Sequence, residues 1–148
     1  MEIELQSKLK TYPKQKMTWQ DFDNHVANII KAMDNQNYRP DYIHGISRGG
    51  LPLSVTLSNR LGIPMILDDG IMLAKSGKNI LICDDLSDTG ETFAAIHNKY
   101  KSKSCEKKLK TTALLYRAGT AVVPDFYSQY LDALLESKDY RWIHFPWE

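Results

Sequence analysis

Several features that would indicate a membrane, secreted or nucleic-acid-binding protein are missing from this 148-residue chain. Its sequence has no apolar run close to the roughly 20 residues that a helix needs to span a bilayer. The first ten residues, MEIELQSKLK, have no apolar core of the kind found in signal peptides. The formal net charge is only +1, so the chain has no general attraction for nucleic acid or for anionic membranes. We therefore expect a soluble cytoplasmic protein that binds neither nucleic acid nor membrane.

Cysteine is also scarce. The chain has two cysteines, Cys83 and Cys105, and their spacing is not that of a metal site. Cys83 lies in an apolar run and is predicted to be a small buried side chain in a reducing compartment. No repeat or low-complexity segment is present, and contents of 43% hydrophobic and 25% charged residues are ordinary for a globular protein. The length fits one domain, residues 1–148, with a single core.

Helical and strand-like segments alternate along the sequence. Thr18 is a suitable N-cap for a first helix, whose apolar residues recur at helical spacing up to Met33. Further helices are predicted over about Gly50–Gly62, Thr89–Tyr100 and Phe126–Lys138. Strands are predicted over Tyr42–Ser47, Ile63–Leu67, Ile80–Cys83, Thr111–Tyr116 and Arg141–Phe145, with a hairpin arm over Ile71–Ala74 and an extended arm or edge strand before Met17. This alternation predicts an α/β fold, with a mostly parallel sheet flanked by helices on both faces.

A short acidic segment follows the most apolar of the predicted strands. Ile80–Cys83 is the kind of continuous apolar run found in central parallel strands that are buried on both faces. The next residues, Asp84–Thr92 (DDLSDTGET), are here called the acidic loop, and they lead into a predicted helix. In open α/β sheets, ligands bind beyond the carboxyl ends of the strands, and a helix N-terminus there offers free N–H groups to a phosphate. The acidic loop is therefore the leading candidate for a binding site.

The residue types in the acidic loop suit a sugar phosphate. Asp84 and Asp85 present acceptors for sugar hydroxyls or for Mg²⁺. Gly90 lets the backbone approach a ligand, while Thr89 and Thr92 supply hydroxyl groups. In a purely structural alternative, one side chain of the loop caps the helix and the remaining carboxylates are solvated. That alternative leaves two carboxylates crowded at the mouth of a buried strand, which is costly unless a cation or hydrogen-bond donors meet them. We therefore favour a binding site.

The acidic loop and the strand before it resemble the signature of the type I phosphoribosyltransferases. That signature is an apolar strand, two acidic residues, two variable positions and then Asp-Thr-Gly-x-Thr. The resemblance implies that Asp84 and Asp85 hold the ribose hydroxyls of phosphoribosyl pyrophosphate, either directly or as ligands of Mg²⁺. It also implies a cradle for the 5′-phosphate formed by Ser87, Asp88, Thr89, Gly90, Glu91 and Thr92. In the 6-oxopurine members, the aspartate before Thr-Gly lies near N7 of the base, which makes Asp88 the candidate catalytic proton acceptor.

A second strand–loop–helix junction carries the residues Ser47, Arg48, Gly49 and Gly50, here called the arginine loop. An arginine can hold an oxyanion with two parallel hydrogen bonds, and glycines permit unusual backbone angles. A plain turn with a surface arginine is the commoner explanation for such a sequence on its own. Together with the acidic loop, however, the segment Gly45–Pro64 resembles the pyrophosphate-binding loop and following helix of the guanine–xanthine phosphoribosyltransferases. The resemblance implies that Arg48, between Ser47 and Gly49, holds the pyrophosphate.

The sequence closes with an aromatic tail, Tyr140–Glu148 (YRWIHFPWE). Aromatic residues in such a position usually belong to the core or to an oligomer contact. This tail, however, closely resembles the Trp-Ile-x-x-Pro-Trp-acidic segment of xanthine and guanine phosphoribosyltransferases. The resemblance implies that Trp142 stacks on the purine and that the backbone of Ile143 reads its edge. Arg117 stands where relatives have a lysine that donates to the 6-oxo group, which leaves the choice among xanthine, guanine and hypoxanthine open.

The lid loop that type I enzymes close over the reacting groups is short in this sequence. Only Met65–Asn79 separates the relevant strands. If a lid is shared between subunits, Lys75 or Lys78 would contact pyrophosphate in a neighbouring subunit. His44, in the strand before the arginine loop, is assigned a structural role.

The resemblance extends from about residue 18 to residue 148 and implies a purine-salvage enzyme. Such an enzyme would transfer 5-phosphoribosyl from phosphoribosyl pyrophosphate to a 6-oxopurine, with Mg²⁺ as cofactor, and would form a homodimer or homotetramer. Residues 1–17 would be an N-terminal arm, and residues 126–148 would form a hood and a base-binding tail. Two alternatives remain open: a non-catalytic sensor that binds phosphoribosyl pyrophosphate or a nucleotide, and a phosphoribosyltransferase for a different acceptor.

Overall fold

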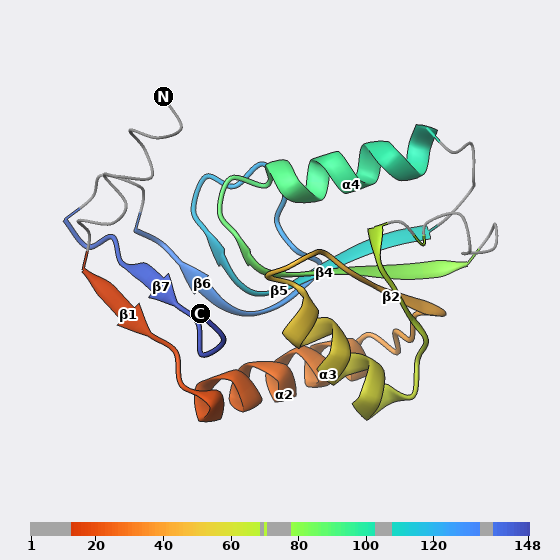
Figure 1. Ribbon diagram of the computed structural model, residues 1–148, viewed down its shortest axis with the longest axis horizontal. Helices are drawn as coiled ribbons and strands as arrows, with labels where there is room; N and C mark the ends of the chain where they lie inside the picture. Colours follow the sequence, from red (N-terminus) through yellow and green to blue (C-terminus); the bar gives the residue numbers. More distant parts are fainter. Residues whose placement is uncertain (1–12, 69, 71–77, 103–107, 134–137) are drawn as a thin grey trace.

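The computed structural model describes residues 13–68, 70, 78–102, 108–133 and 138–148. Its elements are β1 (Lys14–Lys16), α2 (Trp19–Asn35), β2 (Tyr42–Gly45), α3 (Leu51–Leu61), β3 (Met65–Ile66), β4 (Asn79–Ser87), α4 (Glu91–Ser102), β5 (Lys108–Arg117), β6 (Phe126–Leu131) and β7 (Trp142–His144). Within these residues the main sheet has the strand order β3-β2-β4-β5-β6, and all neighbours in it are parallel. A second, two-stranded parallel sheet joins β1 to β7 (Figure 1). The predicted α/β fold with a parallel sheet is confirmed.

Helices lie on both faces of the main sheet, with α2 and α3 on one face and α4 on the other (Figure 1). Helix α2 begins after Thr18, as predicted, because the Thr18 hydroxyl accepts from Asp21 N (3.0 Å) and the Asp21 carboxylate accepts from Thr18 N (2.9 Å). Helix α3 ends where Gly62 takes a left-handed conformation, with a φ of 66°. The buried residues of α2 recur at helical spacing: Phe22, Val26, Ile29 and Met33.

Strand β4 lies at the centre of the main sheet, between β2 and β5. Its side chains are buried on both faces, because Leu81 and Cys83 join the core cluster that contains α2 and α3 residues. Ile80 and Ile82 join the cluster on the α4 face. The predictions of a central strand and of a buried Cys83 are therefore confirmed. The strand is longer than predicted, however, and continues through the first part of the acidic loop to Ser87.

The prediction of a helix over Phe126–Lys138 is wrong, because its first six residues form strand β6. This strand pairs in parallel with β5 and is an edge of the main sheet. Its aromatic residues favour a strand. The carboxylate of Asp125 accepts from Thr111 N on β5 (2.8 Å) and so fixes where the pairing begins. This contact joins residues 14 positions apart in the sequence, which a local helical pattern does not reveal. The first part of the segment expected in a hood therefore belongs to the main sheet.

Strands β1 and β7 form the small second sheet, here called the hood. Backbone bonds extend their pairing at both ends, from Trp142 N to Pro13 O and from Met17 N to His144 O, each 2.9 Å long. The edge strand expected before Met17 is thus present, and it holds the aromatic tail in place. The hairpin arm predicted over Ile71–Ala74 lies outside the described residues.

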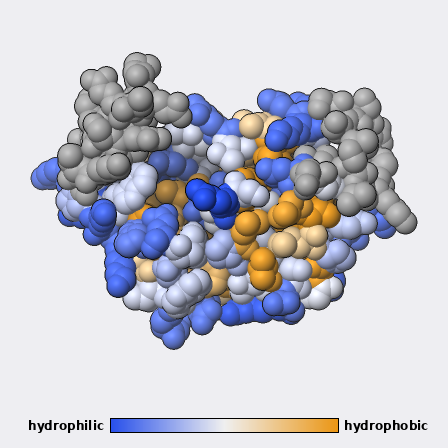
Figure 2. All heavy atoms as spheres, in the orientation of Figure 1, coloured by the Kyte–Doolittle hydropathy of each residue, from blue (hydrophilic) through white to orange (hydrophobic). Residues whose placement is uncertain are grey.

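The surface in Figure 2 is mostly polar, with an apolar patch to the right of centre. Exposed apolar side chains include Val55 of α3, at 46%, and Trp19 at the start of α2, at 56%.

No helix within the described residues is both long enough and apolar enough to cross a membrane.

Candidate active site

A cavity of about 260 Å³ lies where the carboxyl ends of β4 and β5 meet the aromatic tail. Its walls come from segments that are far apart in the sequence: the acidic loop, the end of β5 and the tail. The lining residues are Asp84, Asp85, Leu86, Asp88, Thr92, Arg117, Tyr140, Trp142, Ile143, Phe145 and Glu148. The structure therefore brings together most of the acidic-loop, β5 and tail residues that the sequence singles out.

Asp84 and Asp85 lie side by side on the cavity wall, where β4 ends. Asp84 is 9% exposed, and its carboxylate accepts a hydrogen bond from Asp85 N (2.9 Å). The Asp85 carboxylate accepts from Leu86 N (2.7 Å). Burial raises the pKa of both carboxyls, and the neighbouring Asp85 raises the pKa of Asp84 further. This pair is therefore unfavourable in its ionised form unless a cation or hydroxyl donors bind to it.

The arginine loop lies against the acidic loop. Ser47 and Arg48 are exposed, and the peptide between them is cis. A Cβ atom built on Gly49 would lie 2.5 Å from Asp85 Oδ2, so the close approach of the two loops requires glycine there. The backbone of Gly50 is packed against Cys83 O of β4 in the same way. The backbone of the arginine loop therefore contacts the acidic loop, while Arg48 itself is exposed and does not line the cavity.

The start of α4 has the geometry of an anion site. Gly90 has a φ of 86°, and a Cβ atom there would lie 2.5 Å from Val122 N. The Thr89 hydroxyl accepts from Glu91 N (3.3 Å), while Thr92 lines the cavity. The remaining first-turn N–H groups of a helix have no partner within the helix and attract anions. The residues predicted to form a phosphate cradle, from position 89 to position 92, are thus arranged around one helix start.

Ser87 is an exception among the predicted cradle residues, because its hydroxyl faces away from the cavity. Its Oγ donates to Val122 O (2.8 Å) and lies 2.9 Å from Thr120 Oγ1, and the residue is 2% exposed. The partners of this hydroxyl account for its direction, because both lie in the loop between β5 and β6. The Ser87 hydroxyl is thus bonded within the protein, and the place of Ser87 in a phosphate cradle stays a prediction.

Arg117 and Asp88, predicted for base binding and for proton acceptance, contact each other. Arg117 Nε lies 3.2 Å from Asp88 Oδ1 in an ion pair whose geometry is too bent for a hydrogen bond. The Arg117 Nη2 group donates to the backbone oxygen of Arg141 (2.6 Å), and the guanidinium lies over the Tyr140 ring, 4.1 Å from its centroid. Burial raises the pKa of Asp88, and the positive charge of Arg117 opposes that shift. Arg117 is itself only 3% exposed.

The tail supplies the apolar wall of the cavity. Trp142 is partly buried and Ile143 is 4% exposed. Sequence reasoning did not assign Tyr140, Phe145 or Glu148 to the site, although all three line it. Their position in the same tail as Trp142 and Ile143 could have indicated them. Burial and the nearby Asp85 carboxylate raise the pKa of Glu148, which shows that it faces the acidic side of the cavity.

The carboxylates fit a magnesium ion that is shared with a substrate. Within the described ranges no group of three or more metal-ligating side chains is close enough to form a complete protein site. Mg²⁺ is commonly held by one or two carboxylates together with water and substrate phosphates. Asp84 and Asp85 provide such a pair of hard oxygen donors on the cavity wall.

Two further predicted residues lie apart from the cavity. His44 is fully buried, with Nδ1 2.6 Å from the Tyr100 hydroxyl and Nε2 2.5 Å from Asp68 Oδ1, which agrees with the structural role assigned to it. Lys78 precedes β4, at the end opposite to the acidic loop, and its backbone oxygen accepts from the next strand. Lys75 lies outside the described residues.

Comparison with known proteins gives consistent neighbours for this fold and site. No family model matches the chain. A purine phosphoribosyltransferase from Pyrococcus horikoshii is 29% identical, with 91% of this chain and 93% of that chain covered and a TM-score of 0.74. A xanthine–guanine–hypoxanthine phosphoribosyltransferase from Helicobacter pylori is 20% identical over 92% of this chain and 93% of its own, with a TM-score of 0.75.

A third solved structure, a hypothetical protein from Neisseria gonorrhoeae with bound ppGpp, is 18% identical over 91% of this chain and 90% of its own, with a TM-score of 0.70. The parallel sheet, the acidic loop at the end of its central strand and these neighbours agree with one another. The chain has the fold of the type I phosphoribosyltransferases.

Proposed function

We propose that the protein transfers a 5-phosphoribosyl group from phosphoribosyl pyrophosphate to N9 of a 6-oxopurine, namely xanthine, guanine or hypoxanthine, and releases pyrophosphate. The observation that carries the proposal is that a ribose-phosphate type of loop and an aromatic tail line one cavity. The similarity to purine phosphoribosyltransferases supports the choice of a purine as acceptor.

The donor is proposed to bind across the two loops. Asp84 and Asp85 accept hydrogen bonds from the ribose hydroxyls and would hold Mg²⁺, which when bound neutralises charge on the pyrophosphate. The helix start from Thr89 to Thr92, with Glu91 directed outwards into solvent, receives the 5′-phosphate through backbone N–H groups. Arg48, next to Ser47 and Gly49, holds the pyrophosphate. The close approach of Gly49 to Asp85 supports this arrangement, because it keeps pyrophosphate and ribose subsites adjacent.

The base is proposed to lie on the opposite wall. Trp142 stacks on the purine, and the backbone of Ile143 accepts or donates hydrogen bonds at its edge. In the reaction the bond between C1′ and the pyrophosphate oxygen breaks, the bond between C1′ and N9 forms, and the base loses one proton. Asp88 accepts that proton at N7, and its position at the cavity beside a positive charge supports this role.

We further propose purine salvage in the cytoplasm by a homodimer or homotetramer. The exposed Val55 and Trp19 provide apolar surface that a second copy could cover. Light scattering at micromolar concentration tests this point directly. A purely monomeric protein would remove the oligomer from the proposal and leave the chemistry unaffected.

A second candidate is a non-catalytic protein that binds phosphoribosyl pyrophosphate or a nucleotide. The observation in its favour is the structural neighbour with bound ppGpp. Both candidates predict donor or nucleotide binding, so only turnover separates them.

The test is an incubation of the protein with phosphoribosyl pyrophosphate, Mg²⁺ and one of xanthine, guanine, hypoxanthine, adenine, uracil or orotate. Chromatography then detects the nucleotide. The proposal expects products from 6-oxopurines and little from the other bases. Donor binding by calorimetry without any nucleotide would favour the non-catalytic candidate, and a product from orotate or uracil alone would point to a different acceptor.

A further inference from the structure

Arg117 occupies an unusual position for a residue that is expected to read a base. It is the last residue of β5 and pairs with Leu131 of β6, whereas the pairing of β5 with β4 ends one residue earlier, at Tyr116. The side chain is 3% exposed. Three separate partners hold its guanidinium: the Asp88 carboxylate, the backbone oxygen of Arg141 and the face of the Tyr140 ring. These partners come from two segments: the acidic loop, which β5 already pairs with as far as Ser87, and the start of the tail.

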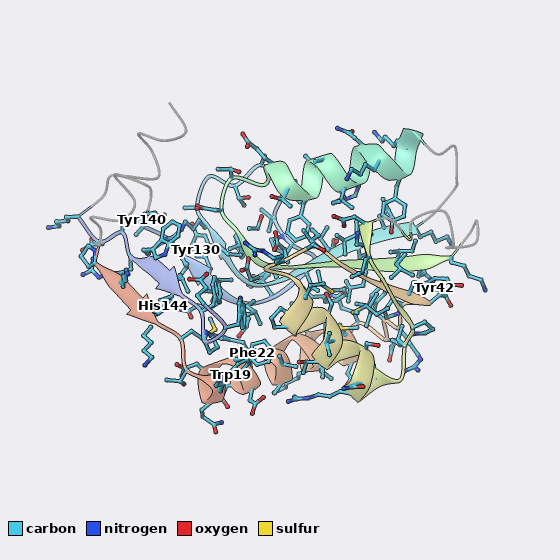
Figure 3. The ribbon with its side chains drawn as sticks, viewed as in Figure 1. Trp19, Phe22, Tyr42, Tyr130, Tyr140 and His144 are labelled. Atoms are coloured by element: carbon cyan, nitrogen blue, oxygen red, sulfur yellow. The ribbon has the colours of Figure 1, made fainter. Side chains whose placement is uncertain are left out.

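The two segments line the cavity in which the base is proposed to bind, on opposite sides. Asp88 belongs to the acidic loop, whereas Tyr140 and Arg141 lead into β7 of the hood. Tyr140 is labelled in Figure 3, where it lies beside β7. The hydrogen bond to Arg141 O is 2.6 Å long and has a charged donor, which makes it stronger than a neutral one. Arg117 is therefore a bridge across the site rather than a side chain that is free to turn towards a ligand.

We propose that Arg117 is a positioning residue that ties the acidic loop to the hood and keeps the Asp88 carboxylate directed at the base. This inference rests on the proposed function for its catalytic meaning. A lysine at this position would have a single ammonium group and could not fill all three roles at once. Arg117 thus sets the distance between Asp88, the proton acceptor, and the cavity wall that carries Trp142. Direct contact with the 6-oxo group of the base is not its main role.

The geometry distinguishes the bridge from a simple surface ion pair. The pair between Arg60 and Asp23 has a similar distance, 3.1 Å, but both of its side chains are more than 40% exposed. Pairs of that kind contribute little, because water screens them. In the Arg117 pair one partner is buried and the other, Asp88, is 43% exposed, so we expect a measurable but moderate effect of the arginine charge on the carboxylate.

The direct test follows the ionisation of Asp88 by the NMR shift of its carboxyl carbon as pH changes. The variants are Arg117→Met, which removes the charge but keeps an apolar stem, Arg117→Lys, and the matched control Arg60→Met. The other titratable groups on the cavity wall are the carboxyls of Asp84, Asp85 and Glu148 and the phenol of Tyr140. All of these stay in place, so a difference between variants reports the change at residue 117.

In Arg117→Met, Asp88 is expected to titrate at a pH higher than in the wild type by roughly half a unit, as for a partly exposed pair. Arg60→Met should match the wild type. Hydrogen exchange at the β7 amides should become faster in Arg117→Met, because methionine cannot donate to Arg141 O. Identical Asp88 titration curves in Arg117→Met and wild type would overturn the proposal. These measurements need no turnover, so they remain decisive even if the chain proves to make no nucleotide.

If turnover is found, a second readout separates the bridge from direct base reading. For Arg117→Lys we expect the KM for the base to rise about tenfold, as for one lost charged hydrogen bond, with donor affinity unchanged. A lysine variant with wild-type KM and pH profile would mean that residue 117 simply donates to the base. Should Arg117→Met fail to fold, Tyr140→Leu removes the ring beneath the guanidinium, and a wild-type base KM in that variant would likewise count against the bridge.

Discussion

Gly49 lies directly against the carboxylate of Asp85, with room for a hydrogen atom but not for a methyl group. The arginine loop and the acidic loop therefore meet without any intervening side chain. In the proposed enzyme this contact keeps the pyrophosphate subsite next to the ribose subsite, and it can be tested by adding one carbon atom.

Gly49→Ala is expected to weaken binding of phosphoribosyl pyrophosphate by about tenfold or more, because the new methyl group must displace the Asp85 carboxylate or the loop. The measurement is calorimetry with Mg²⁺ and donor. The matched control is Gly62→Ala, where nothing lies within 4 Å but φ is 66°. That control should lose about 1 kcal/mol of unfolding free energy and keep its donor affinity. Wild-type donor binding by Gly49→Ala would contradict the proposed subsites.

Asp84→Asn should stabilise the ligand-free protein at neutral pH, on the order of 1 kcal/mol or more. The pKa of Asp84 is raised in the folded protein, so the native state holds its proton more tightly than the unfolded state. Stability from this group is therefore present at low pH and is lost as pH rises from the ordinary aspartate range to the raised pKa. Urea unfolding at several pH values should show the advantage of the variant shrinking as pH falls. An advantage that does not change with pH would contradict this explanation.

Asp88→Asn should lower kcat by roughly 10²- to 10⁴-fold, as expected for the loss of a general base, while donor binding changes little. The side chain keeps its size and its place beside Arg117. Steady-state kinetics and donor calorimetry on the same preparation separate the two effects. If the variant turns over like the wild type, Asp88 is not the proton acceptor.

Trp142→Ala should raise the KM for the base by roughly 5- to 150-fold, which corresponds to a stacking contribution of about 1–3 kcal/mol, and Trp142→Phe should have a smaller effect. Trp19→Phe is the control, since Trp19 is 56% exposed at the start of α2 and does not line the cavity. Equal base KM values for wild type and Trp142→Ala would remove Trp142 from the base site.

Ser87→Ala should reduce the free energy of unfolding by about 1–2 kcal/mol without changing donor affinity. The hydroxyl is buried against Val122 O and Thr120, so its loss removes the shorter of the two hydrogen bonds to that carbonyl oxygen, the other coming from Thr120 Oγ1 (3.3 Å). Thermal unfolding and calorimetry together make the test. A large loss of donor affinity with unchanged stability would restore Ser87 to the phosphate cradle.

Features that depend on neighbouring residues in the sequence were predictable. The capping box of Thr18 and Asp21, the apolar run of β4 and the glycine at the start of α4 all follow from local patterns. The same holds for the acidic loop, because the end of a buried parallel strand fixes where its side chains must lie.

Features that depend on contacts between distant segments were not predictable. β6 pairs with β5 beside the hydrogen bond from Thr111 N to Asp125, and the Ser87 hydroxyl donates to Val122 O, 35 residues along the chain. The bridge from Arg117 to Asp88 joins residues that the sequence assigned to separate tasks. A sequence pattern within one segment does not reveal how close two other segments lie in the fold.

The central claim is that one cavity joins a ribose phosphate to a 6-oxopurine. The most direct measurement is the ratio of nucleotide formed to pyrophosphate released when purified protein is incubated with phosphoribosyl pyrophosphate, Mg²⁺ and each 6-oxopurine in turn. We predict a ratio close to one with at least one of the three bases, and loss of both products in Asp88→Asn. Pyrophosphate release without any nucleotide, or neither product from a protein that binds the donor, would contradict the proposed transfer.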